Sequence, residues 1–182
     1  VDSSNNIVVT GWFDSSSLSI AGQSFNRVSS RDIFIAKYDS AGGSLWALQG
    51  STPGNQNQGL DVVIDSSDYI YTSGRHTGTL TIGTVSKSGN GSSDGYVAKI
   101  SASGVTQWIV NPGSTASEAV TALALDSAGD VYAAIEYVAS FTIAGTTLVN
   151  AASDSTLDVA LVKYNSSGVA QWVRSINGAG QQ

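Results

Sequence analysis

The sequence contains neither cysteine nor methionine in its 182 residues. The absence of cysteine excludes a disulfide framework and a thiolate metal site, and it leaves the redox compartment open. The absence of methionine extends to position 1, so we expect the sequence to be a processed product or a segment of a longer protein. No run approaches the ~20 apolar residues that a transmembrane helix needs, and no signal segment is visible.

Charge is also scarce, because Asp, Glu, Lys and Arg make up only 12% of the residues, and the net charge is −6. The eight basic residues are scattered along the chain. Nucleic acids and anionic membrane surfaces need clustered Lys and Arg, so we expect no nucleic acid and no membrane insertion. Serine, threonine and glycine are abundant, which favours strands and turns over long helices. This composition is typical of an extracellular or cell-surface protein.

Three short phrases recur in the same order along the chain. The first is an apolar residue followed by Asp and Ser, the second is an Asp with a Lys five residues later, and the third is a Trp nine residues after each Lys. Three anchors at fixed offsets predict one repeat domain over 1–182, with units at about 1–57, 58–118 and 119–182. The anchors are Asp2, Asp65 and Asp126, then Asp32, Asp94 and Asp158, then Lys37, Lys99 and Lys163, and finally Trp46, Trp108 and Trp172.

Each unit reads as short strands separated by turn residues. Asp65 begins a tight turn because its side chain can accept a hydrogen bond from the backbone two residues later. Between the second and third strands, apolar and hydroxyl residues alternate and then stop at a glycine, which predicts a half-exposed hairpin. In the middle unit we expect strands at about 58–64, 69–74, 95–100 and 105–110.

The third strand of each unit is a nearly unbroken apolar run, at 33–36, 96–98 and 159–162. Such a strand is covered on both faces, as happens where antiparallel sheets stack face to face. Four-stranded sheets that each lie between two neighbours are the blades of a β-propeller. The expected fold class is therefore all-β, with three tandem four-stranded antiparallel blades of β-propeller type and almost no helix.

The stretch 32–42 reads Asp-Ile-Phe-Ile-Ala-Lys-Tyr-Asp-Ser-Ala-Gly and is followed by Trp46, and a similar stretch at 158–168 precedes Trp172. In the middle copy Ile100 replaces the tyrosine. This pattern resembles the bacterial β-propeller repeat family often labelled SBBP, and the resemblance covers essentially the whole chain. It implies blade architecture, a secreted or surface location, more repeats than three, and no common catalytic site.

The sequence of the first and last units indicates that the three units together lack about one strand. Only Val1 precedes Asp2, whereas a full strand precedes Asp65 and Asp126, and the sequence ends before a further Asp-Ser turn can follow Trp172. We expect three blades that lack about one strand, with an exposed edge and an apolar sheet face. Further repeats of a longer chain, a strand from a second chain in a closed ring, or head-to-tail addition in a filament would each complete the set.

No catalytic constellation emerges from the sequence, so we expect no enzyme and no catalytic residue. The Asp and Lys anchors recur in every unit, which favours a scaffold role in which Asp binds backbone donors and Lys covers the neighbouring blade. Each repeated Trp is expected to pack between blades, although sugar stacking is the alternative. The single histidine, His76, lies in an expected polar loop at 75–78, and Glu118 and Glu136 lack the spacing of an acid and base pair.

Metal and sugar sites are weakly indicated. The stretches 65–68 and 126–130 resemble fragments of calcium loops but lack the bidentate Glu, so we expect no metal and no cofactor, with calcium as the weaker alternative. Asn90 and Asn165 match the acceptor pattern for N-glycosylation in predicted turns.

Three functions fit these observations to different degrees. We expect a structural repeat module that self-associates or continues into adjacent repeats, because the anchors recur and no singular site is present. The alternative is a glycan- or protein-binding module, which would require the variable loops 22–31, 83–93 and 145–157 to form one cleft lined by aromatic residues. An enzyme on a propeller scaffold would need a charged constellation in the central channel, and none is visible.

Overall fold

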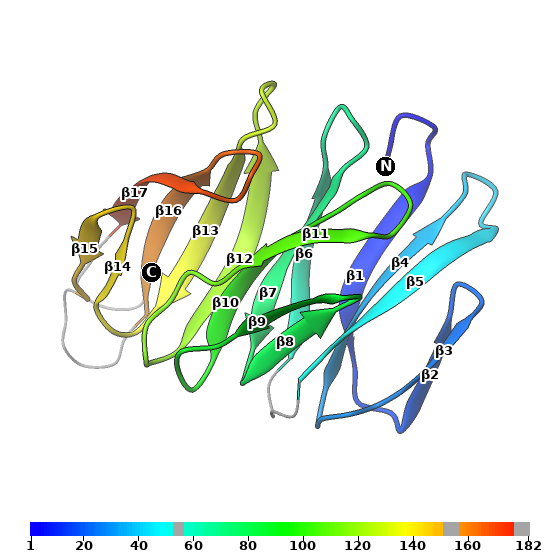
Figure 1. The fold of residues 1–182 in the computed structure, drawn as a ribbon, viewed down its shortest axis with the longest axis horizontal. Helices are drawn as coiled ribbons and strands as arrows, with labels where there is room; N and C mark the ends of the chain where they lie inside the picture. Colours follow the sequence, from blue (N-terminus) through cyan, green and yellow to red (C-terminus); the bar gives the residue numbers. More distant parts are fainter. Residues whose placement is uncertain (53–56, 151–156, 177–182) are drawn as a thin grey trace.

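The computed structural model describes residues 1–52, 57–150 and 157–176, and these residues form antiparallel β-sheets with no helix (Figure 1). Three larger sheets lie side by side in chain order, and two separate hairpins flank them. The all-β expectation is therefore confirmed. The absence of helix follows from the short alternating segments, which are bounded by turns and carry no 3.6-residue period.

The three larger sheets are named here sheet 1, sheet 2 and sheet 3. Sheet 1 contains β1 (Ile7–Phe13), β4 (Asp32–Tyr38) and β5 (Ser44–Ser51), and it is extended by the hairpin of β8 (Thr79–Ile82) and β9 (Val85–Ser88). Sheet 2 contains β6 (Gln58–Ile64), β7 (Ile70–His76), β10 (Asp94–Ile100) and β11 (Thr106–Val110). Sheet 3 contains β12 (Glu118–Leu125), β13 (Val131–Tyr137), β16 (Asp158–Tyr164) and β17 (Ala170–Ile176).

The two separate hairpins are β2 (Ser17–Ile20) with β3 (Gln23–Asn26), and β14 (Phe141–Ile143) with β15 (Thr146–Leu148). They occupy the segments where alternation predicted half-exposed hairpins, so this expectation is confirmed. The four strands expected in the middle unit are also confirmed, each within two residues of its predicted bounds.

The turns that precede β1, β7 and β13 have the same construction in the three sheets. The Asp65 Oδ1 atom accepts hydrogen bonds from the backbone N–H groups of Ser67 and Tyr69, each at 2.9 Å. Asp2 and Asp126 accept equivalent pairs of bonds at 2.8–3.0 Å. The aspartate thus replaces backbone pairing where the chain reverses, as its side-chain chemistry predicts.

The register is also the same in the three sheets. Each Lys anchor lies opposite a Trp anchor, in the pairs Lys37 and Trp46, Lys99 and Trp108, and Lys163 and Trp172. Strands β4, β10 and β16 each begin with an Asp. This Asp lies opposite the last residue of β1, β7 or β13, which is Phe13, His76 or Tyr137 respectively. Residues of the three sheets can therefore be compared position by position.

One cross-strand position shows how side-chain volume is shared within a sheet. Gly11 lies opposite Phe34 in sheet 1, and Gly74 lies opposite Tyr96 in sheet 2, so a large ring covers a glycine. In sheet 3 the volumes are reversed, because Ile135 lies opposite Ala160. Close packing between sheets requires this compensation, since a second large side chain would not fit.

Two sequence expectations were wrong in detail. His76 was expected in a polar loop, but it is the last residue of β7 and is fully buried, because the pairing of β7 with β10 continues to Asp94. The third strand of the last unit was expected to be covered on both faces. In β16 only alternate residues are buried, because no further described sheet lies against its second face.

Candidate functional site

Neighbouring sheets meet face to face in two junctions. In the first, Ile33 and Ile35 of sheet 1 pack in one cluster with Ile70, Tyr96 and Ile100 of sheet 2. The second junction joins Tyr71 and Val97 of sheet 2 to residues of sheet 3 that include Val131, Ile135 and Val162. We call the face of a sheet that meets the preceding sheet its upstream face, and the face that meets the next sheet its downstream face.

The Lys and Trp anchors bind the next sheet at each junction. The Nζ atom of Lys37 and the Nε1 atom of Trp46 both donate to the backbone carbonyl of Ala102, each at 3.1 Å. At the second junction, Lys99 and Trp108 donate to the carbonyl of Ser166 at 3.2 and 3.3 Å. We call this arrangement the Lys–Trp latch. One carbonyl with two lone pairs accepts both donors.

A glycine lies against the Trp ring in both latches. A Cβ atom at Gly104 would lie 3.0 Å from Cδ2 of Trp46, and one at Gly168 would lie 3.1 Å from Cδ2 of Trp108. These glycines have φ angles of 84° and 80°, a region that side chains rarely adopt. Glycine is thus required both for the turn and for the close approach of the ring.

Gly42 and Gly168 belong to the repeat pattern seen in the sequence, but their role beside a Trp ring and the acceptor carbonyl two residues earlier were not predicted. The signal was present, because a glycine follows each Lys anchor by five residues, at Gly42, Gly104 and Gly168. Its partner could not be recognised from spacing alone, because the latch joins residues that are 56 to 67 positions apart.

Other polar contacts tie the junctions together. Ser3 donates from its backbone N–H and its hydroxyl to the Asp68 carboxylate, at 2.8 and 2.6 Å, which lowers the pKa of Asp68. At the second junction, the Leu123 N–H donates to Oδ2 of Asp61 at 2.7 Å. Each junction therefore combines an apolar centre with directed hydrogen bonds.

The upstream face of sheet 1 is uncovered, whereas the same face of sheets 2 and 3 is buried. Ile7 and Val9 are 41% and 37% exposed. Their register equivalents in sheet 2, Ile70 and Thr72, are fully buried, as are Val131 and Ala133 in sheet 3. The β2–β3 hairpin covers only part of the face, around Ala36 and Ala47.

The free edge of β1 belongs to the same region. In sheets 2 and 3 the equivalent strands, β7 and β13, pair with β6 and β12. No strand in the described parts of the chain pairs with that edge of β1. Sheet 1 therefore offers both an apolar face and a row of unpaired backbone groups.

The downstream face of sheet 3 is the other uncovered face. Leu161 and Val159 are half-buried, whereas their equivalents Ile35 and Ile33 in sheet 1 are fully buried. Trp172 stands against Tyr132 at 5.9 Å between ring centroids, in an edge-to-face arrangement. In the described structure its indole N–H reaches no turn of a following sheet.

The Lys anchors differ in their ionic partners. Lys37 forms a buried ion pair with Asp2 at 2.8 Å, in which the side chains are 4% and 3% exposed. Burial opposes ionisation of the Asp2 carboxyl, but hydrogen bonds from Lys37 and Asn6 outweigh it and hold its pKa well below the ordinary value.

Lys163 forms more exposed ion pairs with Asp126 at 3.2 Å and Asp130 at 2.9 Å. Its contacts with Asp130, Tyr132 and Asp126 raise its pKa above the ordinary value. Lys99 lies over the Tyr69 ring, 4.2 Å from the centroid, and burial lowers its pKa. Each Lys stem thus packs beside the Asp turn of its own sheet, and none of the three pairs with the Asp five residues earlier in the sequence.

The Asp anchors that lie five residues before each Lys are the first residues of β4, β10 and β16, and they bind backbone donors there. The carboxylate of Asp32 accepts from the N–H groups of Val28 and Ser29, and that of Asp94 accepts from Asn90 and Gly91. Asp158 is buried at the equivalent position.

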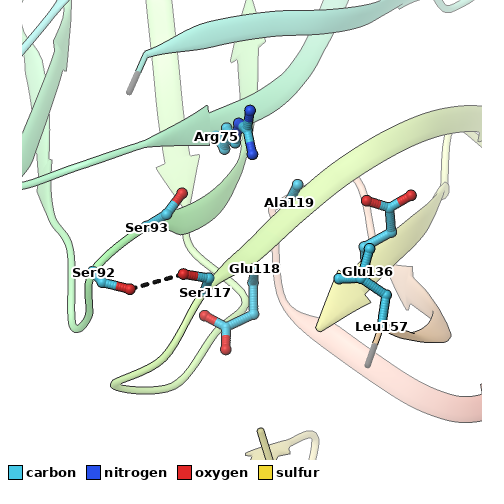
Figure 2. Close-up of a pocket in the computed structure, with 8 residues that line it drawn as sticks. All are labelled: Arg75, Ser92, Ser93, Ser117, Glu118, Ala119, Glu136 and Leu157. Carbon is cyan, nitrogen blue, oxygen red and sulfur yellow. Dashed lines mark hydrogen bonds between the residues drawn. The ribbon is translucent and has the colours of Figure 1, made fainter. Parts of the chain in front are cut away.

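A separate pocket of about 500 Å³ lies between sheets 2 and 3 (Figure 2). Figure 2 shows Arg75 on one side and Glu136 on the other, with Ser92 and Ser117 joined by a hydrogen bond of 2.8 Å. Its lining contains no aromatic residue and takes Ser92, Ser93 and Leu157 from the variable loops; residues 151–156 of those loops lie outside the described structure. The residues that line it are Arg75, Ser92, Ser93, Ser117, Glu118, Ala119, Glu136 and Leu157.

Three titratable groups at or beside this pocket are engaged in structural contacts. Glu118 accepts two hydrogen bonds from Ser114, and burial raises its pKa. Arg75 donates to Oε1 of Gln58 at 2.8 Å. His76 packs edge-to-face on Tyr96, and burial lowers its pKa, so its neutral form is favoured.

The remaining candidate residues lie in turns. Among the described residues, no three His, Asp or Glu side chains are grouped so that they could hold a metal ion. Asn90 is exposed, whereas Oδ1 of Asn165 accepts bonds from the N–H groups of Ser167 and Val169 and closes its own turn. No helix in the described part of the chain is long and apolar enough to cross a bilayer.

A scan against models of protein families found no match, and a search of curated proteins also found none.

Proposed function

We propose that this chain is a non-enzymatic, extracellular structural module of β-propeller type, built of three blades that lack one inner strand. Its two uncovered faces join further blades, supplied by additional repeats or by a neighbouring chain. The observation that carries this proposal is the contrast in burial at equivalent positions, because Ile7 is 41% exposed where Ile70 is fully buried. The resemblance to SBBP-type repeats supports the same function.

The two uncovered faces are complementary. The upstream face of sheet 1 has the register and residue types of faces that bind a preceding sheet, and the downstream face of sheet 3 has those of faces that bind a following sheet. An exposed apolar sheet face with an open edge favours association. A protein that keeps both faces uncovered is expected to use them for assembly.

The experiment is sedimentation and light scattering of the purified protein over a wide concentration range. We expect the average mass to rise with concentration. Val9→Asp, which places a charge on the upstream face of sheet 1, is expected to reduce the association strongly. Val105→Asp is the matched control, because Val105 is 55% exposed in the turn before β11 and lies outside both faces. A wild-type protein that stays monomeric at every concentration would contradict the proposal.

A second candidate function is glycan binding in the pocket between sheets 2 and 3. It is favoured by Ser93, which lines the pocket and whose buried hydroxyl has no hydrogen-bond partner in the described structure. A sugar hydroxyl would satisfy this group. Titration with a panel of oligosaccharides tests this function, with Ser93→Ala expected to weaken binding and the exposed-turn variant Ser103→Ala expected to leave it unchanged. Equal binding by the Ser93→Ala variant, or no binding of any sugar, would exclude it.

A further inference from the structure

We propose that a second copy of this chain covers the upstream face of sheet 1, and that Lys163 and Trp172 of one copy close a third Lys–Trp latch on the Ser40 carbonyl of the next copy. This inference rests on the proposed function and specifies its partner and contact. The two latches that the chain already contains support it.

The acceptor turn is already formed in sheet 1. In the turns after β10 and β16, the N–H of Gly104 donates to the Ser101 carbonyl, and that of Gly168 donates to the Asn165 carbonyl. The turn after β4 has the same bond, from Gly42 to Asp39 at 3.0 Å. Ser40 therefore occupies the position of Ala102 and Ser166, whose carbonyls accept the two existing latches.

The space for the indole ring is also present. Gly42 has a φ angle of 85°, close to the 84° of Gly104 and the 80° of Gly168. A Cβ atom at Gly42 would meet nothing within 4 Å among the described residues, whereas the other two glycines carry a Trp ring. The turn after β4 thus has the shape that receives a tryptophan but holds none.

The donors are present at the opposite end of the chain. Lys163 and Trp172 are paired across β16 and β17, as Lys37 and Trp46 are across β4 and β5. The bond between Lys163 and Asp126 does not compete with the latch, because Lys37 binds Asp2 and the Ala102 carbonyl at the same time. An ammonium group has three donors, so Lys163 keeps one for the Ser40 carbonyl while it binds Asp126 and Asp130.

One chain therefore carries both halves of the same junction, and a second copy is the partner that supplies the missing half. The contact is heterologous, since the downstream face of sheet 3 meets the upstream face of sheet 1. Each copy keeps one free face after binding. Such contacts build a ring if the rotation between copies closes, and a filament if it does not.

Gly42→Asn tests the glycine of the new latch. Asparagine tolerates a positive φ angle, so the turn is kept while its side chain fills the space for Trp172. Gly145→Asn is the matched control, because Gly145 has a φ of 70°, has no neighbour within 4 Å, and lies in the turn of the β14–β15 hairpin. We expect Gly42→Asn to weaken self-association by about tenfold or more, and Gly145→Asn to leave it unchanged.

Trp172→Phe tests the donor, because phenylalanine keeps most of the ring contact and removes the indole N–H. We expect association to weaken by about three- to tenfold, the value of one hydrogen bond. Trp12→Phe is the control, since Trp12 lies under Arg31 and donates to no latch. Tryptophan emission adds a second readout, because it should shift to shorter wavelength as wild-type protein associates, and shift less in Trp172→Phe.

The outcomes separate this inference from the proposed function. If Val9→Asp abolishes association while Gly42→Asn and Trp172→Phe leave it unchanged, the third latch is wrong and the proposed function stands. If the wild-type protein never associates, both are wrong. If Gly42→Asn and Trp172→Phe weaken association and their controls do not, the third latch is supported.

Discussion

Sheet 1 and sheet 2 share the order and register of three strands, β1-β4-β5 and β7-β10-β11, and the same anchors, yet their upstream faces have opposite environments. Ile7 in sheet 1 is 41% exposed, and Ile70 at the equivalent position is fully buried. The local sequence is similar, so the difference arises from the neighbour and not from the strand. In a stacked fold, burial is a property of the junction, and an unfilled junction is visible as an apolar strand in water.

The largest effect is expected from truncating the two isoleucines. Ile70→Ala removes a fully buried side chain and leaves a cavity, so we expect a loss of about 3 kcal/mol in the free energy of unfolding. Ile7→Ala removes a side chain that is partly in water, so we expect about 1 kcal/mol or less in dilute solution. Urea unfolding of both variants measures this, and equal losses would show that the two faces do not differ in environment.

The next effect comes from the Lys anchors. Lys37→Met leaves the Asp2 carboxylate buried without its cation, and we expect a loss of about 3 kcal/mol in unfolding free energy. Lys163→Met is the matched change in sheet 3, where the ion pairs are more exposed, and we expect a much smaller loss. Thermal unfolding compares the two variants. A larger loss for Lys163→Met would contradict the proposed difference between a filled and an unfilled junction.

The smallest effect concerns His76, which stands where Phe13 and Tyr137 stand in the other sheets. Its pKa is lowered by burial, so the unfolded chain binds the proton more readily, and stability falls as pH drops below about 6.5. Between about pH 7.5 and about pH 5.5 we expect wild type to lose about 1 kcal/mol relative to His76→Phe, measured by urea unfolding. The raised pKa of Glu118 gives an opposite slope, but that residue is present in both proteins. Parallel pH profiles would show that His76 is protonated equally in both states.

The sequence predicted the strands well, because alternation, turn residues and the spacing of anchors are local features. The Asp65 turn follows from side-chain chemistry within five residues, and the strand positions around it were predicted within two residues. The position of His76 was missed, because a polar residue at the end of a strand looks like the start of a loop. Its burial depends on pairing with Asp94.

The latches could not be predicted, because they depend on which turn the neighbouring sheet presents. Trp46 binds a carbonyl 56 residues away, and only the stacked arrangement brings these groups together. The same reason explains why burial of β16 was overestimated. An apolar strand sequence indicates what a face can bind, whereas the presence of the partner is not encoded in that strand.

The most direct test of the account is to mix two variants that each lack one face. Val9→Asp damages the upstream face of sheet 1, and Leu161→Asp damages the downstream face of sheet 3, so each alone is expected to be monomeric by light scattering. Mixed in equal amounts, they retain one intact junction, and we expect a 1:1 dimer that grows no further. A mixture that stays monomeric while the wild type associates, or variants that still associate alone, would contradict the account.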